Sequence, residues 1–419
     1  MHEKLTGWSG QIRDVHEWRN ILAKFALLFF GIALWHVGTS FYAYYLISIA
    51  WILDGGLYRF RQTLNEPLVA AILILCIVFA IGILWSEYPK LGFKVWRRYI
   101  AFLVFIPYLS LLNKERLPWA IGGLLIGYFG VVAIGIYQWQ IVGVPGIPPL
   151  NMPHLFFSSM IGIGVIVACY LAAISKTKKV RFLLCLLAIS LLFIQFNQMS
   201  RGILATTLIC LAFMGLLLYK REIKRFLVTM AALTIVAGIF AYSSSTFHER
   251  VLQAKSDISQ SKAGNYSTSL GYRLAVWDVG LHGIAEHPFF GHGTGMAANY
   301  FDKTRDTYKD GLYSELSEFI PATYHYHNDW IEIGMHLGAF GLITYAFLLW
   351  SWFRTLRAHQ LGIFGATLIL FVFLSGLSDN FIIFRQSLFL LLATTAIAIS
   401  WQKVHGQVFQ QTKNYRRYV

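Results

Sequence analysis

Two arginines lie where strongly apolar stretches of the chain are interrupted. Arg201 belongs to the short polar break Asn197–Gly202, and Arg273 follows Tyr272 at the start of an amphipathic stretch. A guanidinium is a planar, permanently charged fork that can hold two phosphate oxygens at once. Taken alone, each arginine is more simply explained by a side chain that reaches lipid headgroups or water. Taken together, they indicate a site for a phosphorylated substrate.

His327 lies at the start of another apolar stretch, in a His-Tyr-His-Asn sequence that also contains His325. An imidazole at the water–membrane boundary, with an ordinary pKa of about 6.5, can accept a proton from a hydroxyl group. A structural histidine at the start of a helix is the alternative. The following Asp329 and Glu332 also suit a metal site, but no His-Glu-x-x-His motif is present, and His336 should lie deeper and on another face. We therefore expect a general base and no metal.

Four cations, Lys90, Lys94, Arg97 and Arg98, form a basic cluster between two apolar stretches. Spacings of three and four place Lys90, Lys94 and Arg97 on one face of a helix. Such a face can bind phosphorylated lipid headgroups, provided that the loop is assigned to the correct side of the membrane. The candidate substrate-binding residues are Arg201, Arg273, Lys94, Arg97, Arg98 and Arg385, the last being a lone cation between two apolar stretches.

The elements that must position these residues are membrane helices. Of the 419 residues, 57% are hydrophobic and only 13% are charged, against about 45–50% and 25% in an ordinary soluble domain. Since a bilayer core of about 30 Å needs roughly 20 apolar residues per helix, the sequence predicts an all-α polytopic membrane protein with about twelve transmembrane helices. The predicted spans are 21–38, 41–56, 67–86, 99–112, 119–139, 155–175, 182–196, 202–219, 226–242, 331–353, 360–378 and 381–401.

The basic residues predict the orientation. With a cytoplasmic N-terminus, the inner segments carry 21 Lys and Arg and the short outer segments carry 6, as expected for membrane proteins. We therefore expect both termini in the cytoplasm and the candidate site on the outer side. This distribution also explains most of the net charge of +15, so no nucleic-acid partner is needed.

The predicted organisation has three parts: transmembrane helices 1–9 in residues 1–242, an outer polar segment in residues 243–330, and helices 10–12 with a cytoplasmic tail in residues 331–419. The stretch 243–332 holds 11 of the 20 acidic residues, and a polar insertion this long is usually functional. Within it, we expect a mobile Ser/Gly-rich stretch over 256–269. An amphipathic helix over 270–286 should rest on the membrane through Leu274, Trp277, Leu281 and Ile284, and 290–295 should form a tight turn.

In combination, these features resemble the O-antigen ligase and polymerase superfamily of bacterial envelope glycosyltransferases. The resemblance rests on Ser200-Arg201-Gly202, on Arg273 with Trp277, on the Pro288–Gly293 turn, and on His327-Asn328 leading into a glycine-containing span. It covers residues 190 to 350 in motifs and the whole chain in topology. Each motif is short, and it is their order and spacing that are specific.

The resemblance implies a metal-independent glycosyltransferase without cofactors in the bacterial inner membrane, with a periplasmic active site. Its donor would be a glycan linked to undecaprenyl pyrophosphate, held and stabilised as it leaves by Arg201 and Arg273. His327 matches the essential histidine, although His325 could share its role. The basic cluster favours lipid A-core as the acceptor, which makes an O-antigen ligase the leading prediction. A polysaccharide polymerase on the same lipid carrier, a protein O-oligosaccharyltransferase and a polysaccharide-lipid transporter are the alternatives. Apart from Lys24, charged residues lie at the borders of the apolar spans, without the carboxylates inside the membrane that are expected of a coupled transporter.

Overall fold

The computed structural model describes residues 2–143, 148, 152–314, 316 and 325–415, and within these ranges the side chains of 17–405. Every regular element in the described ranges is helical. The predicted outer segment 243–330 includes residues 315 and 317–324, which lie outside the described residues, as do residues 1 and 416–419 of the predicted termini.

Each predicted apolar span coincides with a helical segment. Most of them are long α-helices, whereas the predicted span 99–112 is a 3-10 turn, Ile100–Val104, followed by a short helix. The helices are α1 (His2–Ala33), α2 (Val37–Leu53), α4 (Pro67–Ile81), α6 (Phe105–Leu111), α7 (Leu117–Tyr137), α8 (His154–Ile174), α9 (Lys178–Phe196), α10 (Arg201–Tyr219), α11 (Ile223–Ser243), α15 (Asp329–Ala358), α16 (Gly362–Ser378) and α17 (Arg385–Tyr415).

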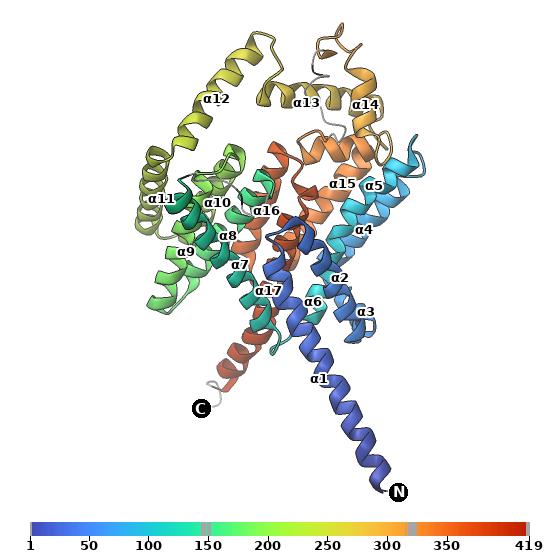
Figure 1. Cartoon of the computed structure of the whole chain (residues 1–419), viewed down its shortest axis with the longest axis vertical. Helices are drawn as coiled ribbons and strands as arrows, with labels where there is room; N and C mark the ends of the chain where they lie inside the picture. The colour runs from blue at the N-terminus through green and yellow to red at the C-terminus, as the bar shows by residue number, and fades with distance from the viewer. Residues whose placement is uncertain (1, 144–147, 149–151, 315, 317–324, 416–419) are drawn as a thin grey trace.

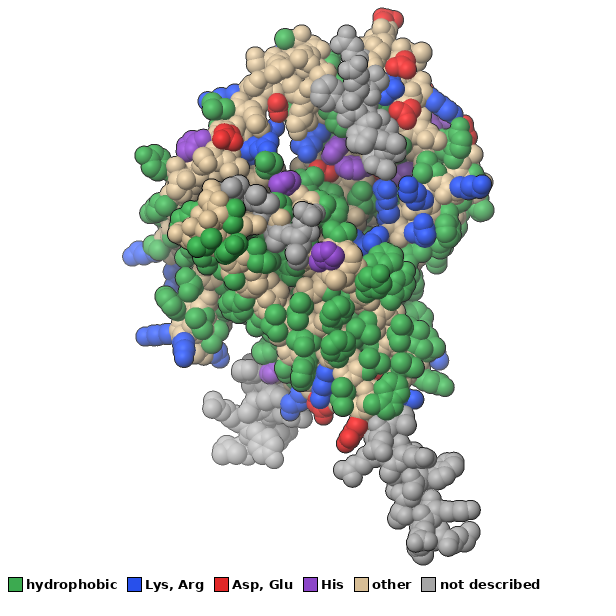
Figure 2. All heavy atoms as spheres, in the orientation of Figure 1, with side chains coloured by type: hydrophobic (Ala, Val, Ile, Leu, Met, Phe, Trp, Pro, Cys, Tyr) green, Lys and Arg blue, Asp and Glu red, His purple; other side chains and the backbone are tan. Residues whose placement is uncertain are grey.

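Seven of the described helices are long and apolar enough to cross a membrane: α7 to α11, α15 and α17. An eighth span results if α3 (Gly56–Thr63) and α4, which meet at an angle of 101°, are taken together. Apolar side chains cover the middle of the molecule, and charged side chains and histidines gather toward its two ends (Figure 2). The prediction of an all-α polytopic membrane protein is confirmed.

The polar helices α5 (Pro89–Tyr99), α12 (Ser245–Lys262), α13 (Ser269–Glu286) and α14 (Ala297–Thr304) lie at one end of the bundle. The beginning of α1 and the end of α17 lie at the opposite end of the bundle (Figure 1). The expectation of a mobile stretch over 256–269 is wrong in its first half, because α12 continues to Lys262. Ser244 caps the start of this helix by accepting a hydrogen bond from the amide of Phe247 at 3.1 Å, a strong stabilising device for a polar helix.

Helix α13 forms over nearly the predicted range and lies across the end of the bundle (Figure 1). The predicted apolar stripe matches the buried face only in part: Leu274 and Leu281 are 39% and 57% exposed, whereas Trp277 and Ile284 are half-buried against the cluster that contains Ala275. Small residues also pack inward, among them Ala275 and Gly280. A Cβ added at Gly280 would lie 2.5 Å from the Ile331 side chain, so this face lets α13 approach α15 closely.

Helix α15 is central and packs against α4, α13 and α16. The glycine-rich turn Phe290–Gly295 wedges against a kink in α15 at Gly338, where φ is +58°. The amide of His292 donates to the carbonyl of Met335 at 2.9 Å. A Cβ at Gly338 would lie 2.5 Å from the backbone of Phe289. The turn predicted from sequence is confirmed, and it fixes the start of α15.

Candidate active site

His327 lies in the short loop that leads into α15. Its φ of +48° is unusual for a residue with a side chain. The next residue, Asn328, caps α15 by accepting hydrogen bonds from the amides of Trp330 and Ile331 at 2.9 and 3.2 Å. The Asn328 side-chain amide also donates to the carbonyl of Leu377 at 3.2 Å. The cap therefore ties the His327 loop to the end of α16.

Asp379, the residue after α16, contacts two of the three predicted catalytic side chains, His327 and Arg273. Its Oδ1 lies 3.1 Å from Nδ1 of His327, and its Oδ2 lies 3.3 Å from the guanidinium of Arg273 on α13. Burial of this carboxyl, which is only 1% exposed, opposes ionisation. The hydrogen bond to His327 and the nearby charges of His327, His325 and Arg273 outweigh burial, and hold the pKa of Asp379 below its ordinary value. A carboxylate therefore joins an imidazole to a guanidinium.

His325 lies beside His327, and their ring centroids are 4.2 Å apart. Its Nδ1 is 3.8 Å from Oδ1 of Asp379 and accepts a hydrogen bond from the amide of His327 at 3.3 Å. Burial, together with the neighbouring imidazole of His327, lowers the pKa of His325 to about 4. His325 is thus neutral near pH 7 and contacts His327 without carrying charge.

Arg201 is the first residue of α10, and its guanidinium is held by α12. It donates to Asp257 at 2.7 Å and to the carbonyl of Arg250 at 3.1 Å. Arg201, Arg273, Asp257 and Asp379 line one cavity of about 260 Å³. The structure therefore brings both predicted arginines to one cavity, and Asp379 connects that cavity to His327.

The carboxylates that the sequence suggested for a metal site point elsewhere. Asp329 accepts a hydrogen bond from the hydroxyl of Tyr345 at 3.1 Å, and Glu332 lies 3.3 Å from Nε2 of His336. All four side chains are buried in or beside α15. These two pairs stabilise the start of α15. Neither Asp329 nor Glu332 is therefore hydrogen-bonded to the ring of His325 or His327.

Within the described ranges, one group of three side chains could hold a metal ion: His325, His327 and Asp379, whose ligand atoms lie within 4.8 Å of one another. Arg273 contacts the same carboxylate. A divalent cation would therefore share Asp379 with a permanent positive charge, which disfavours its binding electrostatically.

The basic cluster lies on α5, as its spacing predicted. Lys90, Lys94 and Arg97 are exposed and Arg98 is half-buried. The charge of Arg98 is close enough to act on both His325 and Arg385. Arg385 itself starts α17 and lies over the ring of Phe41 at 4.7 Å. Arg98 is thus the member of the cluster that acts electrostatically on the histidine pair, and basic side chains gather on the surface over α5 (Figure 2).

Residues 186–346 match a protein-family model described as O-antigen ligase. This segment contains Arg201, Arg273 and His327. Over this segment, which is less than half of the chain, the protein is similar to the O-antigen ligase family.

Two curated proteins are similar to parts of this chain. An uncharacterized protein of Haemophilus influenzae is 29% identical over 154 residues, which cover 35% of this chain and 37% of that protein. An O-antigen ligase of Escherichia coli is 28% identical over 203 residues, which cover 47% of this chain and 46% of that protein. The chain therefore matches less than half the length of either relative.

Sequence reasoning missed two acidic residues of the site, Asp379 and Asp257. Asp379 lies outside the segment that matches the O-antigen ligase model. The sequence did contain a signal for Asp379. It is an acidic residue between two apolar spans, on the side of the membrane where His327 is predicted to lie. Asp257 gave no such signal, because it lies in the Ser-rich stretch that was expected to be mobile.

Proposed function

We propose that this chain belongs to the O-antigen ligase superfamily and is a glycosyltransferase that moves O-antigen polysaccharide from undecaprenyl pyrophosphate to a sugar hydroxyl of lipid A-core. One observation carries the proposal. His327 and Arg273 meet on the buried carboxylate of Asp379, which lines a cavity together with Arg201. The arrangement combines a proton acceptor with two permanent cations, as transfer from a pyrophosphate donor requires.

His327 is the proposed general base. Asp379 at Nδ1 favours the tautomer with the proton on that nitrogen, and leaves the lone pair of Nε2 free to accept a proton. As the acceptor hydroxyl loses its proton to Nε2, its oxygen forms a bond to the anomeric carbon of the donor glycan. Asp379 stabilises the imidazolium that results, as a carboxylate partner of a catalytic histidine does.

Arg201 and Arg273 are the proposed leaving-group residues. When the bond between the anomeric carbon and the pyrophosphate oxygen breaks, its electron pair leaves with undecaprenyl pyrophosphate. Cations already in place where this charge develops lower the barrier, and one such donor is worth about 10²–10³ in rate. The two arginines come from α10 and α13 and need no metal ion to supply this charge, so we propose a metal-independent reaction without cofactors.

The basic face of α5 supports lipid A-core as the acceptor. Arg98 acts electrostatically on His325, and Lys94 and Arg97 belong to the same helix, whereas Arg201 and Arg273 line the cavity on the α12 side. A phosphorylated lipid held by α5 and Arg385 would present its sugar toward His327. We also propose that this end of the bundle faces the periplasm of the inner membrane and that both termini are cytoplasmic, in agreement with the distribution of Lys and Arg.

A reconstituted reaction tests the proposal. Purified protein would receive undecaprenyl-pyrophosphate glycan and lipid A-core in EDTA, and the products would be separated by size and by lipid. Glycan on lipid A-core is the expected result. Longer glycan still on undecaprenyl would instead show a polymerase, and a strict requirement for a divalent ion would assign His325, His327 and Asp379 to a metal site.

A further inference from the structure

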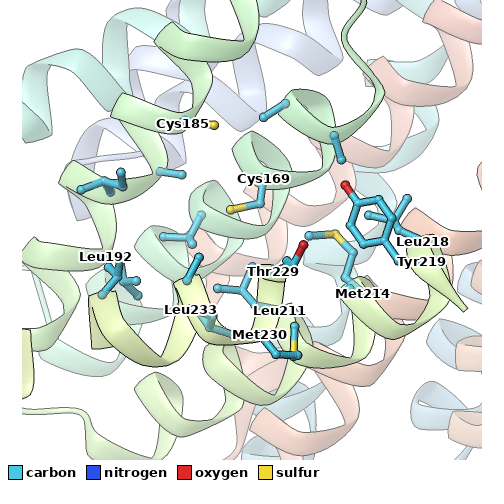
Figure 3. Close-up of a pocket in the computed structure, with 18 of the residues that line it drawn as sticks. Cys169, Cys185, Leu192, Leu211, Met214, Leu218, Tyr219, Thr229, Met230 and Leu233 are labelled. Atoms are coloured by element: carbon cyan, nitrogen blue, oxygen red, sulfur yellow. The ribbon is translucent and has the colours of Figure 1, made fainter. Parts of the chain in front are cut away.

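A second cavity, of about 690 Å³, lies between α8, α9, α10 and α11 (Figure 3). Its volume is within the range of about 300–1,000 Å³ that is typical of ligand pockets. It is lined by the second halves of α8 and α10, by α9 from Arg181 to Leu192 and by α11 from Arg225 to Val236. Since α10 begins at Arg201, this cavity lies at the end of the bundle opposite the candidate active site.

The lining is apolar over most of its surface. Leu192, Leu211, Met214, Met230 and Leu233 are typical of it (Figure 3). A cavity lined by such side chains does not retain water, because it offers water too few hydrogen-bond partners.

The cavity is as deep as one leaflet. Along α9 it extends from Arg181 to Leu192, and along α11 from Arg225 to Val236. Each of these distances is eleven residues, or about 16 Å at the helical rise per residue. Half of a bilayer core of about 30 Å is nearly the same length. An acyl chain whose headgroup lies at the arginines would therefore end near the bilayer midplane.

Arg181 and Arg225 are the charged residues of this lining. Arg181 donates to the carbonyl of Ser175 at 2.7 Å, and Arg225 pairs with Glu222 at 2.6 Å. Because a guanidinium has five N–H donors, both side chains keep donors for a phosphate. The segments 176–181 and 220–225, which include the first turns of α9 and α11, contain eight Lys and Arg and one acidic residue, so the mouth of the cavity attracts an anion.

Helix α11 is held only loosely by the rest of the bundle. None of its residues is buried, and Leu227, Val228 and Ile235 are each more than half exposed. Exposure of this kind is ordinary where lipid covers a helix. The wide, unfilled contact between α11 and α9 is unusual, because membrane helices pack through close van der Waals contact.

We propose that this cavity binds one anionic glycerophospholipid of the adjoining leaflet, with its phosphate at Arg181 and Arg225 and an acyl chain between α9 and α11. The length, apolarity and basic mouth of the cavity fit both parts of such a lipid. A zwitterionic lipid has the same chains but no net charge, so it binds less tightly.

A series of contacts connects the proposed lipid cavity to the candidate active site. Ser244, which joins α11 to α12, donates to the Asn197 side chain at 3.0 Å. Helix α12 then provides the Asp257 carboxylate that pairs with Arg201. A lipid that holds α11 in place therefore also supports the helix that contacts Arg201. The lipid site itself does not depend on the proposed function.

The test counts bound lipid on the full-length protein. The protein is stripped of lipid in detergent and titrated with phosphatidylglycerol or with phosphatidylcholine of the same chains, and bound lipid is measured by native mass spectrometry. Arg181→Gln with Arg225→Gln removes the headgroup contacts, and Ala188→Phe fills the cavity. Arg354→Gln is the matched control, because it removes a cation from the same end of the bundle, outside the cavity.

We expect one tightly bound phosphatidylglycerol in the wild type and in Arg354→Gln. The double arginine variant should bind it about 30-fold more weakly, since each cation near the surface is worth about fivefold. Thermal midpoints without lipid show whether Ala188→Phe is folded. Equal affinity in the wild type and the double variant would overturn the proposal. Two other results would also overturn the proposal: a protein that retains undecaprenyl phosphate and no other lipid, or a lipid-free protein that dimerises through α11.

Discussion

Oδ1 of Asp379 lies 3.1 Å from Nδ1 of His327, although 52 residues separate them in the chain. The other oxygen of the same carboxylate contacts Arg273. One buried group therefore orients the proposed base and one of the proposed leaving-group cations. A change at Asp379 should affect both proton transfer and departure of the pyrophosphate.

Asp379→Asn should lower kcat by about 10²-fold or more, because the amide can present its N–H to His327 and stabilise the wrong tautomer. Donor binding should change less, because Arg201 remains in the cavity. Steady-state transfer with both substrates measures the two effects. Asp306→Asn, which removes an exposed carboxylate of the same polar end, is the control and should be silent. An Asp379→Asn enzyme with normal kcat would remove Asp379 from the mechanism.

Asp257→Asn should tighten donor binding. The carboxylate of Asp257 neutralises Arg201 at 2.7 Å in the structure, and an incoming pyrophosphate has to replace it. Loss of a partly exposed ion pair of about 1 kcal/mol corresponds to a donor KM about fivefold lower. Glu249→Gln, at an exposed position of the same helix, should leave KM unchanged. A higher donor KM would mean that Asp257 positions Arg201 and does not compete with the substrate.

His325 should not contribute to the pH dependence of activity between pH 5 and 8. Burial lowers its pKa to about 4, so it is neutral throughout this range. His325→Gln should therefore keep the pH of half-maximal kcat/KM, even if the rate falls. A shift of that pH would show that His325 titrates in the working range.

The same pKa shift has a consequence for stability. Between pH 6.5 and 4 the unfolded chain binds a proton at His325 that the folded chain does not, so the free energy of unfolding decreases as the pH falls. In His325→Gln the thermal midpoint should decrease less over this interval. His282→Gln, at a half-buried position of α13, should retain the wild-type decrease.

Gly338→Ala should destabilise the protein by about 1–3 kcal/mol, because φ is +58° and the new Cβ would press on Phe289. The kink at Gly338 fixes the start of α15, so activity should fall together with stability. Thermal unfolding in detergent measures the effect. Gly130→Ala places its Cβ in open space on α7 and should not lower the midpoint. An unchanged midpoint in Gly338→Ala would show that the kink can relax.

Much of the fold follows from the sequence because helix length and apolarity are local properties. The buried face of α13 could not be predicted in this way, because it consists largely of small residues, which allow α13 to approach α15 closely. Of the large apolar side chains that marked the predicted face, Leu274 and Leu281 are exposed. The predicted arginines and His327 stood out by their position at the ends of apolar stretches. Asp379 could not be paired with His327 from sequence, because the contact depends on how α16 packs against α15.

The most direct test of the account is transfer by His327→Ala in the reconstituted reaction, compared with the wild type and with His282→Ala. If His327 is the general base, the His327→Ala variant binds undecaprenyl-pyrophosphate glycan with normal affinity but forms no glycan on lipid A-core, whereas His282→Ala transfers normally. Unaltered turnover by His327→Ala would contradict it.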